Sequence, residues 1–322
     1  MSVLVTGGAG YIGSALVSEL LDNGYEVISI DDLSRGDYRH LEDRANDSRL
    51  KPIVGDICDI VKLEKIVKEA KHVDAIFHLA AVPGLKLCQA NPLKAIMTNI
   101  CGTYNVLEVA KKFKIDKVIF TSSAAVYGDP LKVPLEETHP KRPKNLYGIT
   151  KLAAELLLIN YYQEHNLPIV ILRLGNVYGL GLFTYWESVI PKFVRQALSG
   201  EALTIFGTGE QTRDFIHVQD VVKALKLALD AEDVAGEIFN VGTGEPVSVN
   251  TVAEMVSKIA EEELNIRPEI TYLKPRKGDI LTPGFCLCVD KIKKRLKFKP
   301  TWHLEAGIRQ LVKHFLSLRT GP

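Results

Sequence analysis

The sequence predicts an α/β protein with a doubly wound parallel sheet and a smaller C-terminal lobe. In its first half, short apolar segments typical of strands alternate with longer segments that have helical periodicity. A glycine-rich turn, Thr6-Gly-Gly-Ala-Gly-Tyr-Ile-Gly13, separates the first strand from the first helix. After about residue 175 the alternation becomes irregular, which indicates a change of architecture.

The alternating half predicts strands connected by right-handed helical crossovers, with helices on both faces of the sheet. The expected strands are 3–6, 26–30, 51–54, 75–78, 117–121 and 169–173. The expected helices are 11–22, 59–70, 92–113 and 146–164. Ligands of such sheets gather at the carboxyl ends of the strands, so we look for functional residues there.

The irregular half predicts a lobe that closes over the sheet. Its expected elements are a strand at 203–206 and helices at 186–199, 218–230, 249–262 and 303–317. We therefore divide the chain into a larger domain, 1–175, and a mainly second-lobe region, 176–322. Parts of 210–245, namely 218–231 and 237–241, are expected to return to the larger domain.

The composition is that of an ordinary globular protein, with 322 residues, 46% hydrophobic and 25% charged. Lys and Arg number 40 against 39 Asp and Glu, so no overall field attracts nucleic acid or an anionic membrane. The first residues read as a strand, without the basic region or cleavage site of a signal peptide. We therefore expect a cytoplasmic protein with neither nucleic acid nor a membrane as partner.

The cysteines and histidines predict neither disulfides nor a metal site. Five cysteines, an odd number, are scattered through segments that read as helix and strand, and we interpret them as packing residues. Cys286 and Cys288 lack a second pair at zinc-site spacing, and the eight histidines show no metal-binding spacing.

The glycine-rich turn predicts a dinucleotide site in a Rossmann-type sheet. Glycines at these spacings allow a tight turn, close approach of a pyrophosphate to the backbone and close packing of helix on strand. The free N–H groups at the start of the helix then face the phosphates. The predicted contacts are Gly7, Gly10, Tyr11, Ile12 and Gly13.

Acidic residues follow the next two strands. Asp31 and Asp32 end the second strand, where a carboxylate accepts hydrogen bonds from ribose hydroxyls and repels a 2′-phosphate, so NAD is favoured over NADP. Asp56 and Ile57 follow the third strand and suit the edge of an adenine. An alternative for Asp56 is to cap the helix expected from residue 59.

Tyr147 and Lys151 lie four residues apart at the start of a predicted helix, so their side chains share one helical face. A tyrosine with an ordinary pKa of about 10 needs a nearby cation to act as a base near neutrality. Two solvated side chains on a helix surface are the alternative interpretation of this spacing.

Several motifs together resemble the extended short-chain dehydrogenase/reductase family: the glycine turn, His78-Leu-Ala-Ala81, Asn99, Thr121-Ser-Ser-Ala-Ala-Val-Tyr-Gly128 and Tyr147-x-x-x-Lys151. Three more resemble its nucleotide-sugar epimerases, of the UDP-glucose 4-epimerase type: Arg173-Leu-Gly-Asn-Val-Tyr-Gly179, Gln211-Thr-Arg-Asp-Phe-Ile-His-Val218 and Pro275-Arg-Lys-Gly-Asp279. The resemblance covers nearly the whole chain.

The resemblance implies NAD as cofactor and a role for each motif. Tyr147, as a phenolate stabilised by Lys151, would take a proton from a sugar hydroxyl while a hydride passes to NAD. Lys151 would also hold the nicotinamide ribose, and Ser123 would share the hydrogen bond to the reacting oxygen, with Ser122 as the other candidate. Further NAD contacts carried over from the family's motifs are Leu79, Ala80, Ala81 and Asn99.

Ala124 and Ala125 narrow the reaction. Related dehydratases hold an Asp-Glu pair at these positions, and related decarboxylases hold a glutamate there, whereas methyl groups move no protons. We therefore expect oxidation and re-reduction of one carbon without elimination, which inverts a hydroxyl centre.

The second lobe is expected to bind the nucleotide sugar. Asn176 and a pair of arginines would hold the diphosphate, since the planar guanidinium suits phosphate oxygens. The predicted substrate-binding residues are Ser123, Tyr147, Asn176, Arg213, Arg276 and Asp279, with Phe206 or Phe215 near the base.

The substrate itself stays open at this level. UDP-glucose and UDP-galactose are favoured because no arginine lies between 174 and 194 to hold a uronate carboxylate. A UDP-uronate and a UDP-N-acetylhexosamine are the alternatives. Cys88 replaces a serine that relatives often place near the sugar, and the segment 280–288 is longer than usual, so the residue that would select N-acetylated sugars is not located.

Two further expectations concern partners. A non-catalytic NAD-binding regulator is the alternative from another functional class, although such a protein has no need of Tyr147, Lys151 and Ser123 together. Family resemblance also implies a homodimer that pairs through helices 92–113 and 146–164.

Overall fold

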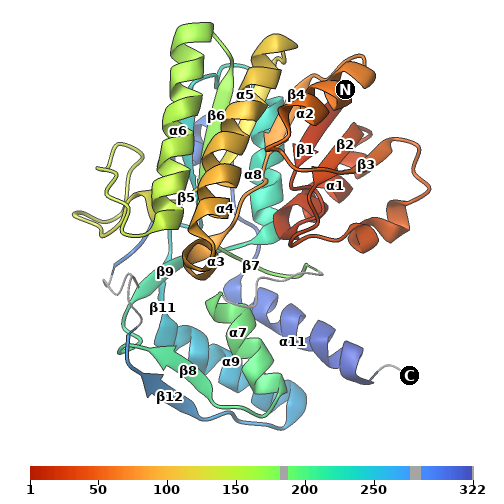
Figure 1. Ribbon diagram of the computed structural model, residues 1–322. Helices are drawn as coiled ribbons and strands as arrows, with labels where there is room; N and C mark the ends of the chain where they lie inside the picture. The colour runs from red at the N-terminus through yellow and green to blue at the C-terminus, as the bar shows by residue number, and fades with distance from the viewer. Residues whose placement is uncertain (182–187, 276–283, 321–322) are drawn as a thin grey trace.

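A parallel seven-stranded sheet forms the centre of the computed structural model, which describes residues 1–181, 188–275 and 284–320 (Figure 1). The strand order is β10-β6-β5-β4-β1-β2-β3, and every neighbouring pair is parallel. The predicted α/β class and Rossmann-type sheet are thus confirmed. The strands are β1 (Ser2–Thr6), β2 (Glu26–Asp31), β3 (Leu50–Val54), β4 (Ala75–His78), β5 (Lys117–Ser123), β6 (Ile169–Leu174) and β10 (Glu237–Val241).

The central strands are buried along their whole length because helices cover both faces of the sheet. All six residues of β6, Ile-Val-Ile-Leu-Arg-Leu, are buried, and three of them carry the β-branched side chains that favour strands. Each fully buried Leu or Ile side chain contributes about 1.5–3 kcal/mol to folding. The continuous apolar runs in the sequence therefore correspond to strands with two covered faces.

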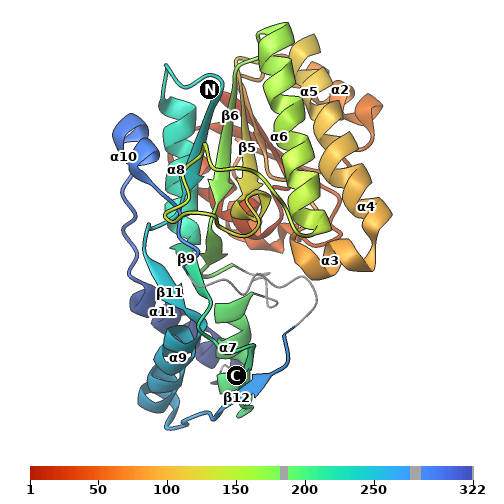
Figure 2. The ribbon, with the colours of Figure 1, turned by 90° about the vertical axis from the view of Figure 1, so that its left-hand side faces the viewer.

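Two groups of helices make these covers, as Figure 2 shows. One core lies between the sheet and α1, α8 and α10, and the other lies between the sheet and α2, α5 and α6. These helices are α1 (Tyr11–Asp22), α2 (Ile60–Glu69), α5 (Thr103–Lys112), α6 (Leu146–His165), α8 (Val218–Asp230) and α10 (Asp290–Leu296).

The single helix expected at 92–113 is wrong in detail. The chain forms α4 (Pro92–Ile96), a π-helical turn (Met97–Gly102) and then α5, and it forms a helix at α3 (Gly84–Ala90) where none was predicted. Within the π-helical turn, the Thr103 hydroxyl donates to the Asn99 carbonyl at 2.7 Å. The Asn99 amide bonds Val82 and Thr150, so contacts to other segments accompany the wider turn.

The second lobe has its own core below the carboxyl ends of the strands (Figures 1 and 2). A three-stranded sheet, β11-β9-β7, and a two-stranded sheet, β12-β8, pack with three helices. The elements are β7 (Asn176–Tyr178), β8 (Leu203–Phe206), β9 (Thr212–His217), β11 (Pro246–Ser248), β12 (Ile270–Leu273), α7 (Val189–Leu198), α9 (Val249–Leu264) and α11 (Leu304–Thr320).

The chain passes more than once between the two lobes. After β9 in the second lobe, α8 packs against α1, and β10 joins the edge of the main sheet beside β6. β11 then pairs with β9 in the second lobe. None of the described helices combines the length and apolar character needed to cross a membrane.

Candidate active site

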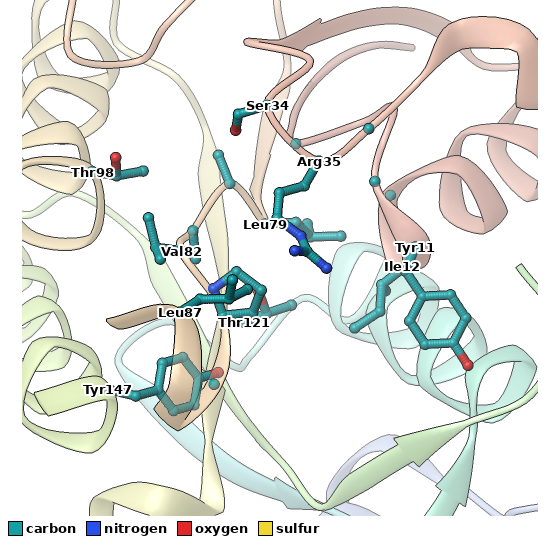
Figure 3. A pocket seen from close by; sticks show the side chains of 18 of the residues that line it. Tyr11, Ile12, Ser34, Arg35, Leu79, Val82, Leu87, Thr98, Thr121 and Tyr147 are labelled. Atoms are coloured by element: carbon teal, nitrogen blue, oxygen red, sulfur yellow. The ribbon is translucent and has the colours of Figure 1, made fainter. Parts of the chain in front are cut away.

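A cleft of about 600 Å³ runs along the carboxyl ends of the sheet strands and reaches the second lobe at Asn176 and Ser188. Figure 3 shows side chains from both sides pointing into it. Most residues expected from the sequence line this cleft. They are Gly7, Gly10, Tyr11, Ile12, Gly13, Asp31, Asp32, Asp56, Ile57, Leu79, Ala80, Ala81, Ser123, Tyr147, Lys151 and Asn176.

The glycine turn at the cleft wall has no room for side chains. Gly7 has a φ of +73°, and a Cβ on it would lie 2.7 Å from the Ala80 nitrogen. A Cβ on Gly13 would lie 2.0 Å from the Gly7 carbonyl oxygen. No side chain caps the start of α1, so its first N–H groups face the cleft, where the turn fits a pyrophosphate.

Asp31 and Asp32 have different surroundings at the end of β2. The buried Asp31 carboxylate accepts from the backbone N–H of Ala9 at 3.1 Å and of Leu33 at 2.9 Å, which ties it to the glycine turn. Burial raises its pKa above the ordinary value. Asp32 is exposed, and although partial desolvation opposes the change, hydrogen bonds from Ser34 and Lys94 lower its pKa overall.

The alternative proposed for Asp56 is settled by a neighbouring aspartate. Asp59 caps α2 by accepting from the Lys62 N–H at 3.0 Å. Asp56 instead accepts from the Cys58 N–H at 2.8 Å in the turn after β3, and it faces the cleft beside Ile57. Asp56 is therefore not the helix cap.

The N-terminus of α6 presents Tyr147 and Lys151 to the cleft. Asn145 caps the helix by accepting from the Gly148 N–H at 2.9 Å. In Figure 3 the Tyr147 hydroxyl points toward the cleft. Ser123, at the end of β5, starts a short 3₁₀ turn by accepting from the Ala125 N–H at 3.2 Å. Helix start and strand end thus bring the three candidate reacting residues to one cleft.

Lys151 is almost fully buried, and its ammonium donates to the Thr121 carbonyl at 2.8 Å. Burial lowers its pKa to about 8, while Cys88 and Glu155 oppose the shift. The neighbouring His78 bonds the hydroxyls of Thr6 and Thr103 at 2.7 and 2.9 Å, and burial followed by the charge of Lys151 lowers its pKa to about 3. His78 is neutral near pH 7, whereas Lys151, one helical turn from Tyr147, carries a positive charge.

The side chains of Asn99 and Tyr11 make hydrogen bonds with other segments of the chain. Asn99 does not line the cleft; its amide is buried and bonds both backbone groups of Val82, at 2.7 and 3.1 Å. The Tyr11 hydroxyl donates to the Gly179 carbonyl at 2.9 Å, toward the second lobe, as its direction in Figure 3 indicates. Asn99 therefore positions the loop that begins at Val82, which lines the cleft.

Fewer of the predicted substrate-binding residues line the cleft. Asn176 lines the cleft, whereas Arg213 does not; Arg213 donates to the Thr212 carbonyl, and its guanidinium lies 5.8 Å from the Phe285 ring. Arg276 and Asp279 lie outside the described residues. Phe215 is buried in the core of the second lobe, and the Phe206 ring faces the Lys192 ammonium at 4.7 Å.

Several lining residues were missed by the sequence interpretation. Arg35 extends toward the middle of the cleft in Figure 3, and Lys94 from α4 bonds Asp32 at 3.3 Å. Ser34-Arg35-Gly36 follows the acidic strand end after one intervening residue, Leu33, a position that could have signalled a cofactor contact. The other missed residues include Val82, Pro83, Gly84, Leu87, Thr98, Thr121, Gly175, Val177 and Ser188.

Comparison with known proteins adds independent evidence. Residues 3–242 match the model of the NAD-dependent epimerase/dehydratase family. A protein of Methanocaldococcus jannaschii, provisionally named as a UDP-glucose 4-epimerase, is 37% identical over 313 residues, 96% of this chain and 97% of the relative. A dTDP-D-glucose 4,6-dehydratase of Bos taurus is 35% identical over 263 residues, 81% of this chain and 73% of the relative.

A solved structure is similar over the full length. The UDP-glucose 4-epimerase of Thermotoga maritima, solved with UDP-glucose, has a TM-score of 0.88 and 35% sequence identity. The likeness covers 99% of this chain and 100% of the solved chain.

Proposed function

The chain belongs to the NAD-dependent epimerase/dehydratase family, and from this premise we propose that it is a UDP-sugar epimerase that interconverts UDP-glucose and UDP-galactose. The reaction would pass through a transient 4-keto sugar. One observation carries the proposal: Ser123, Tyr147 and Lys151 line the same cleft as the glycine turn. The larger lobe would hold the dinucleotide and the second lobe the nucleotide sugar.

The residues around the glycine turn would hold NAD. The turn and the uncapped N-terminus of α1 would hold the pyrophosphate, and Asp31 or Asp32 would accept from a ribose hydroxyl. Bound NAD supplies an acceptor that takes a hydride from the sugar and returns it.

Tyr147 is the proposed proton-transfer residue. Its phenolate would take the proton from the sugar 4-hydroxyl and return it after the keto sugar has turned. Lys151, buried one helical turn away, would favour the phenolate through its positive charge. Ser123 would donate to the same reacting oxygen and keep it within reach of Tyr147.

The turn after Ser123 supports epimerisation rather than elimination. Ala124, 5% exposed, and Ala125 occupy the positions at which elimination would need an acid and a base. A site with methyl groups there can move the tyrosine proton and the hydride but has no second proton donor at these two positions. This feature favours an epimerase over a dehydratase for this chain.

The charges along the cleft favour a neutral sugar. Among the described lining residues, Asp31, Asp32, Arg35 and Asp56 come from the ends of β2 and β3 and the segments after them, Lys94 comes from α4, and Lys151 comes from α6. The described loop nearest the proposed sugar position contributes apolar side chains, Val82, Pro83 and Leu87. A UDP-uronate and a UDP-N-acetylhexosamine are the alternative substrates of the same chemistry.

The test is the interconversion itself. Wild-type protein should convert UDP-galactose to UDP-glucose, and Tyr147→Phe should lower kcat by roughly 10²–10⁴-fold. A parallel panel of UDP-glucuronate and UDP-N-acetylglucosamine identifies the preferred sugar. The proposal fails if wild type produces no UDP-glucose, or if Tyr147→Phe turns over as fast as wild type.

We also propose a homodimer formed through α4, α5 and α6, which lie side by side on one outer face (Figures 1 and 2). This face exposes large apolar side chains, including Leu93 at 69%, Tyr104 at 45% and Leu156 at 57%. Surfaces of this kind commonly mark an interface. Measurement of the mass in solution tests this proposal: the mass of two chains is expected, and a monomer at micromolar concentration would rule the dimer out.

A further inference from the structure

A buried ion pair lies behind the candidate reacting residues. Glu155 on α6 and Arg173 on β6 are each 1% exposed, and Arg173 donates through Nε at 2.9 Å and Nη2 at 2.7 Å to the two carboxylate oxygens. A buried pair of this kind is weak evidence for stability, because desolvation of both charges offsets their attraction. Its geometry therefore suggests a role beyond stability.

The remaining bonds of the pair reach other segments. The Ser122 hydroxyl donates to Glu155 Oε1 at 2.5 Å. Arg173 Nη1 donates to the Tyr127 hydroxyl at 2.9 Å and to the Glu137 carbonyl at 2.8 Å. Tyr127 donates in turn to Asn240 Oδ1 at 2.6 Å. One buried network thus joins α6, β5, β6, β10 and the loop that follows β5.

Each of three segments in this network also carries a candidate site residue. Glu155 lies one helical turn beyond Lys151, which itself lies one turn beyond Tyr147. Ser122 directly precedes Ser123, and Arg173 lies three residues before Asn176. The bond between Ser122 and Glu155 therefore sets the distance between the helix that carries the tyrosine and the strand that carries the serine.

The helix and the strand also meet at the reactive end. A Cβ on Gly148 would lie 2.6 Å from the Ala125 carbonyl oxygen, so α6 approaches the turn after Ser123 as closely as backbone allows. Gly148 limits the approach, and Ser122 with Glu155 fixes it about two turns further along the helix. Because α6 is held at two separate points, its orientation relative to β5 is fixed. With a single contact the helix could pivot about that point.

We propose that Ser122, Glu155 and Arg173 are positioning residues for the reaction, which fix α6 against the end of β5 so that Tyr147 and Ser123 reach the same substrate oxygen. The inference rests on the proposed epimerisation. Ser122 also lines the cleft, but its hydroxyl donates to Glu155, so none of the three would touch the reacting atoms. A small displacement of a reacting group costs rate rather than substrate affinity, so the effect falls on kcat.

The test compares two buried serines. Ser122→Ala removes the hydroxyl between strand and ion pair and leaves both charges paired. Ser257→Ala is the matched control: Ser257 is 7% exposed, donates to the Pro268 carbonyl at 3.3 Å and lies on α9 in the second lobe. Urea denaturation, bound NAD, KM and kcat are measured for both variants and wild type.

We expect both variants to bind NAD like wild type and to lose similar stability. Ser122→Ala should lower kcat roughly tenfold with KM within about twofold, whereas Ser257→Ala should keep wild-type kcat. Ser122→Thr, which retains a hydroxyl on a strand, should recover most of the rate. The proposal is overturned if Ser122→Ala keeps wild-type kcat, or if both variants lose kcat equally. An inactive wild type would instead count against the proposed function.

Glu155→Gln gives a second measurement. It removes the carboxylate charge but keeps an oxygen acceptor, and a soluble variant should lose more kcat than Ser122→Ala, since Arg173 is then left partly unpaired. A soluble Glu155→Gln protein with wild-type kcat would contradict the proposal. If the variant does not fold, the serine comparison alone decides.

Discussion

The two halves of the cleft are built by different means. At the ends of β1 and β2 the wall is backbone: Gly10 donates to the Gly7 carbonyl at 3.1 Å, and Gly7 donates to Ile30 at 2.8 Å. Toward the second lobe, buried side chains join segments that are far apart in the chain. Asp214 on β9 accepts from the N–H groups of Thr243, Gly244 and Leu287 at 2.7, 3.0 and 3.4 Å.

This difference determines how a substitution would disturb each half of the cleft. A backbone wall tolerates no added atom, because its groups already touch. Where side chains join distant segments, a substitution removes individual hydrogen bonds, and the segments that those bonds joined can then shift relative to one another. Substitutions beside the glycine turn should therefore weaken NAD binding and leave the nucleotide sugar bound. Substitutions toward the second lobe should weaken binding of the nucleotide sugar and leave NAD bound.

The largest effect is expected in the backbone half. The Cβ of Gly13→Ala would lie 2.0 Å from the Gly7 carbonyl oxygen, so the turn must open. We expect a loss of roughly 3 kcal/mol in the free energy of unfolding and roughly 100-fold weaker NAD binding. Urea denaturation and titration with NAD measure both.

Gly24→Ala is the control for this variant. Unlike Gly13, Gly24 has a positive φ, of +81°, and nothing lies within 4 Å of its added Cβ. It should cost roughly 1 kcal/mol through backbone strain and leave NAD binding unchanged. Equal NAD affinity in the two variants would show that the wall is not as rigid as its contacts imply.

A smaller effect is expected in the half joined by side chains. Asp214→Asn replaces a buried acceptor of four hydrogen bonds with a group that has one acceptor oxygen. Gly175, which lines the cleft, packs against the backbone of Asp214. Arg213 directly precedes Asp214 in the chain. We expect KM for the nucleotide sugar to rise about tenfold, with bound NAD unchanged.

Asp220→Asn is the matched control. Asp220 is 1% exposed and accepts from the N–H of Thr301 at 2.8 Å and of Trp302 at 3.1 Å, away from the cleft lining. It should lose stability of the same order, roughly 1–3 kcal/mol, without a change in KM. A KM increase common to both aspartate variants would assign the effect to general loosening of the second lobe.

The smallest effect is expected where the halves meet. Tyr11→Phe removes the hydroxyl that donates to Gly179 at 2.9 Å but keeps the ring against Gly181. Loss of one such bond costs about 1 kcal/mol, so KM for the nucleotide sugar should rise by at most about fivefold. Tyr25→Phe, whose hydroxyl bonds the distant Asp230 at 3.1 Å, is the control. Weaker NAD binding in Tyr11→Phe, with unchanged KM, would contradict this assignment.

The sequence signal for a cleft-lining residue was strongest where the residues of the motif are neighbours in the chain. The glycine turn, the acidic end of β2 and the spacing of Tyr147 and Lys151 each fit within one strand-turn-helix unit, so their residue types carry the signal. Asp56 shows the limit of this approach, because two aspartates near the start of α2 suit a cap, and the geometry alone selects Asp59.

Prediction was weaker where a role depends on distant partners. The pattern at 92–113 is that of a continuous helix, and the π-helical turn accompanies bonds from Asn99 to Val82 and Thr150. The sequence also gave no indication that Ser122 bonds Glu155, because the two residues are 33 positions apart and lie on different elements. Arg213 matches a family motif, yet it does not line the cleft.

The sequence by itself determined the parallel sheet, the family and the residues that line the cleft beside the glycine turn, because periodicity, glycine spacing and strand-end residues act through local geometry. The tertiary structure decided which buried groups face one another: Glu155 with Arg173 and Ser122, and Asp214 with the backbone of 243–244. These pairings depend on packing between elements far apart in the chain, and local propensity carries no information about such distances.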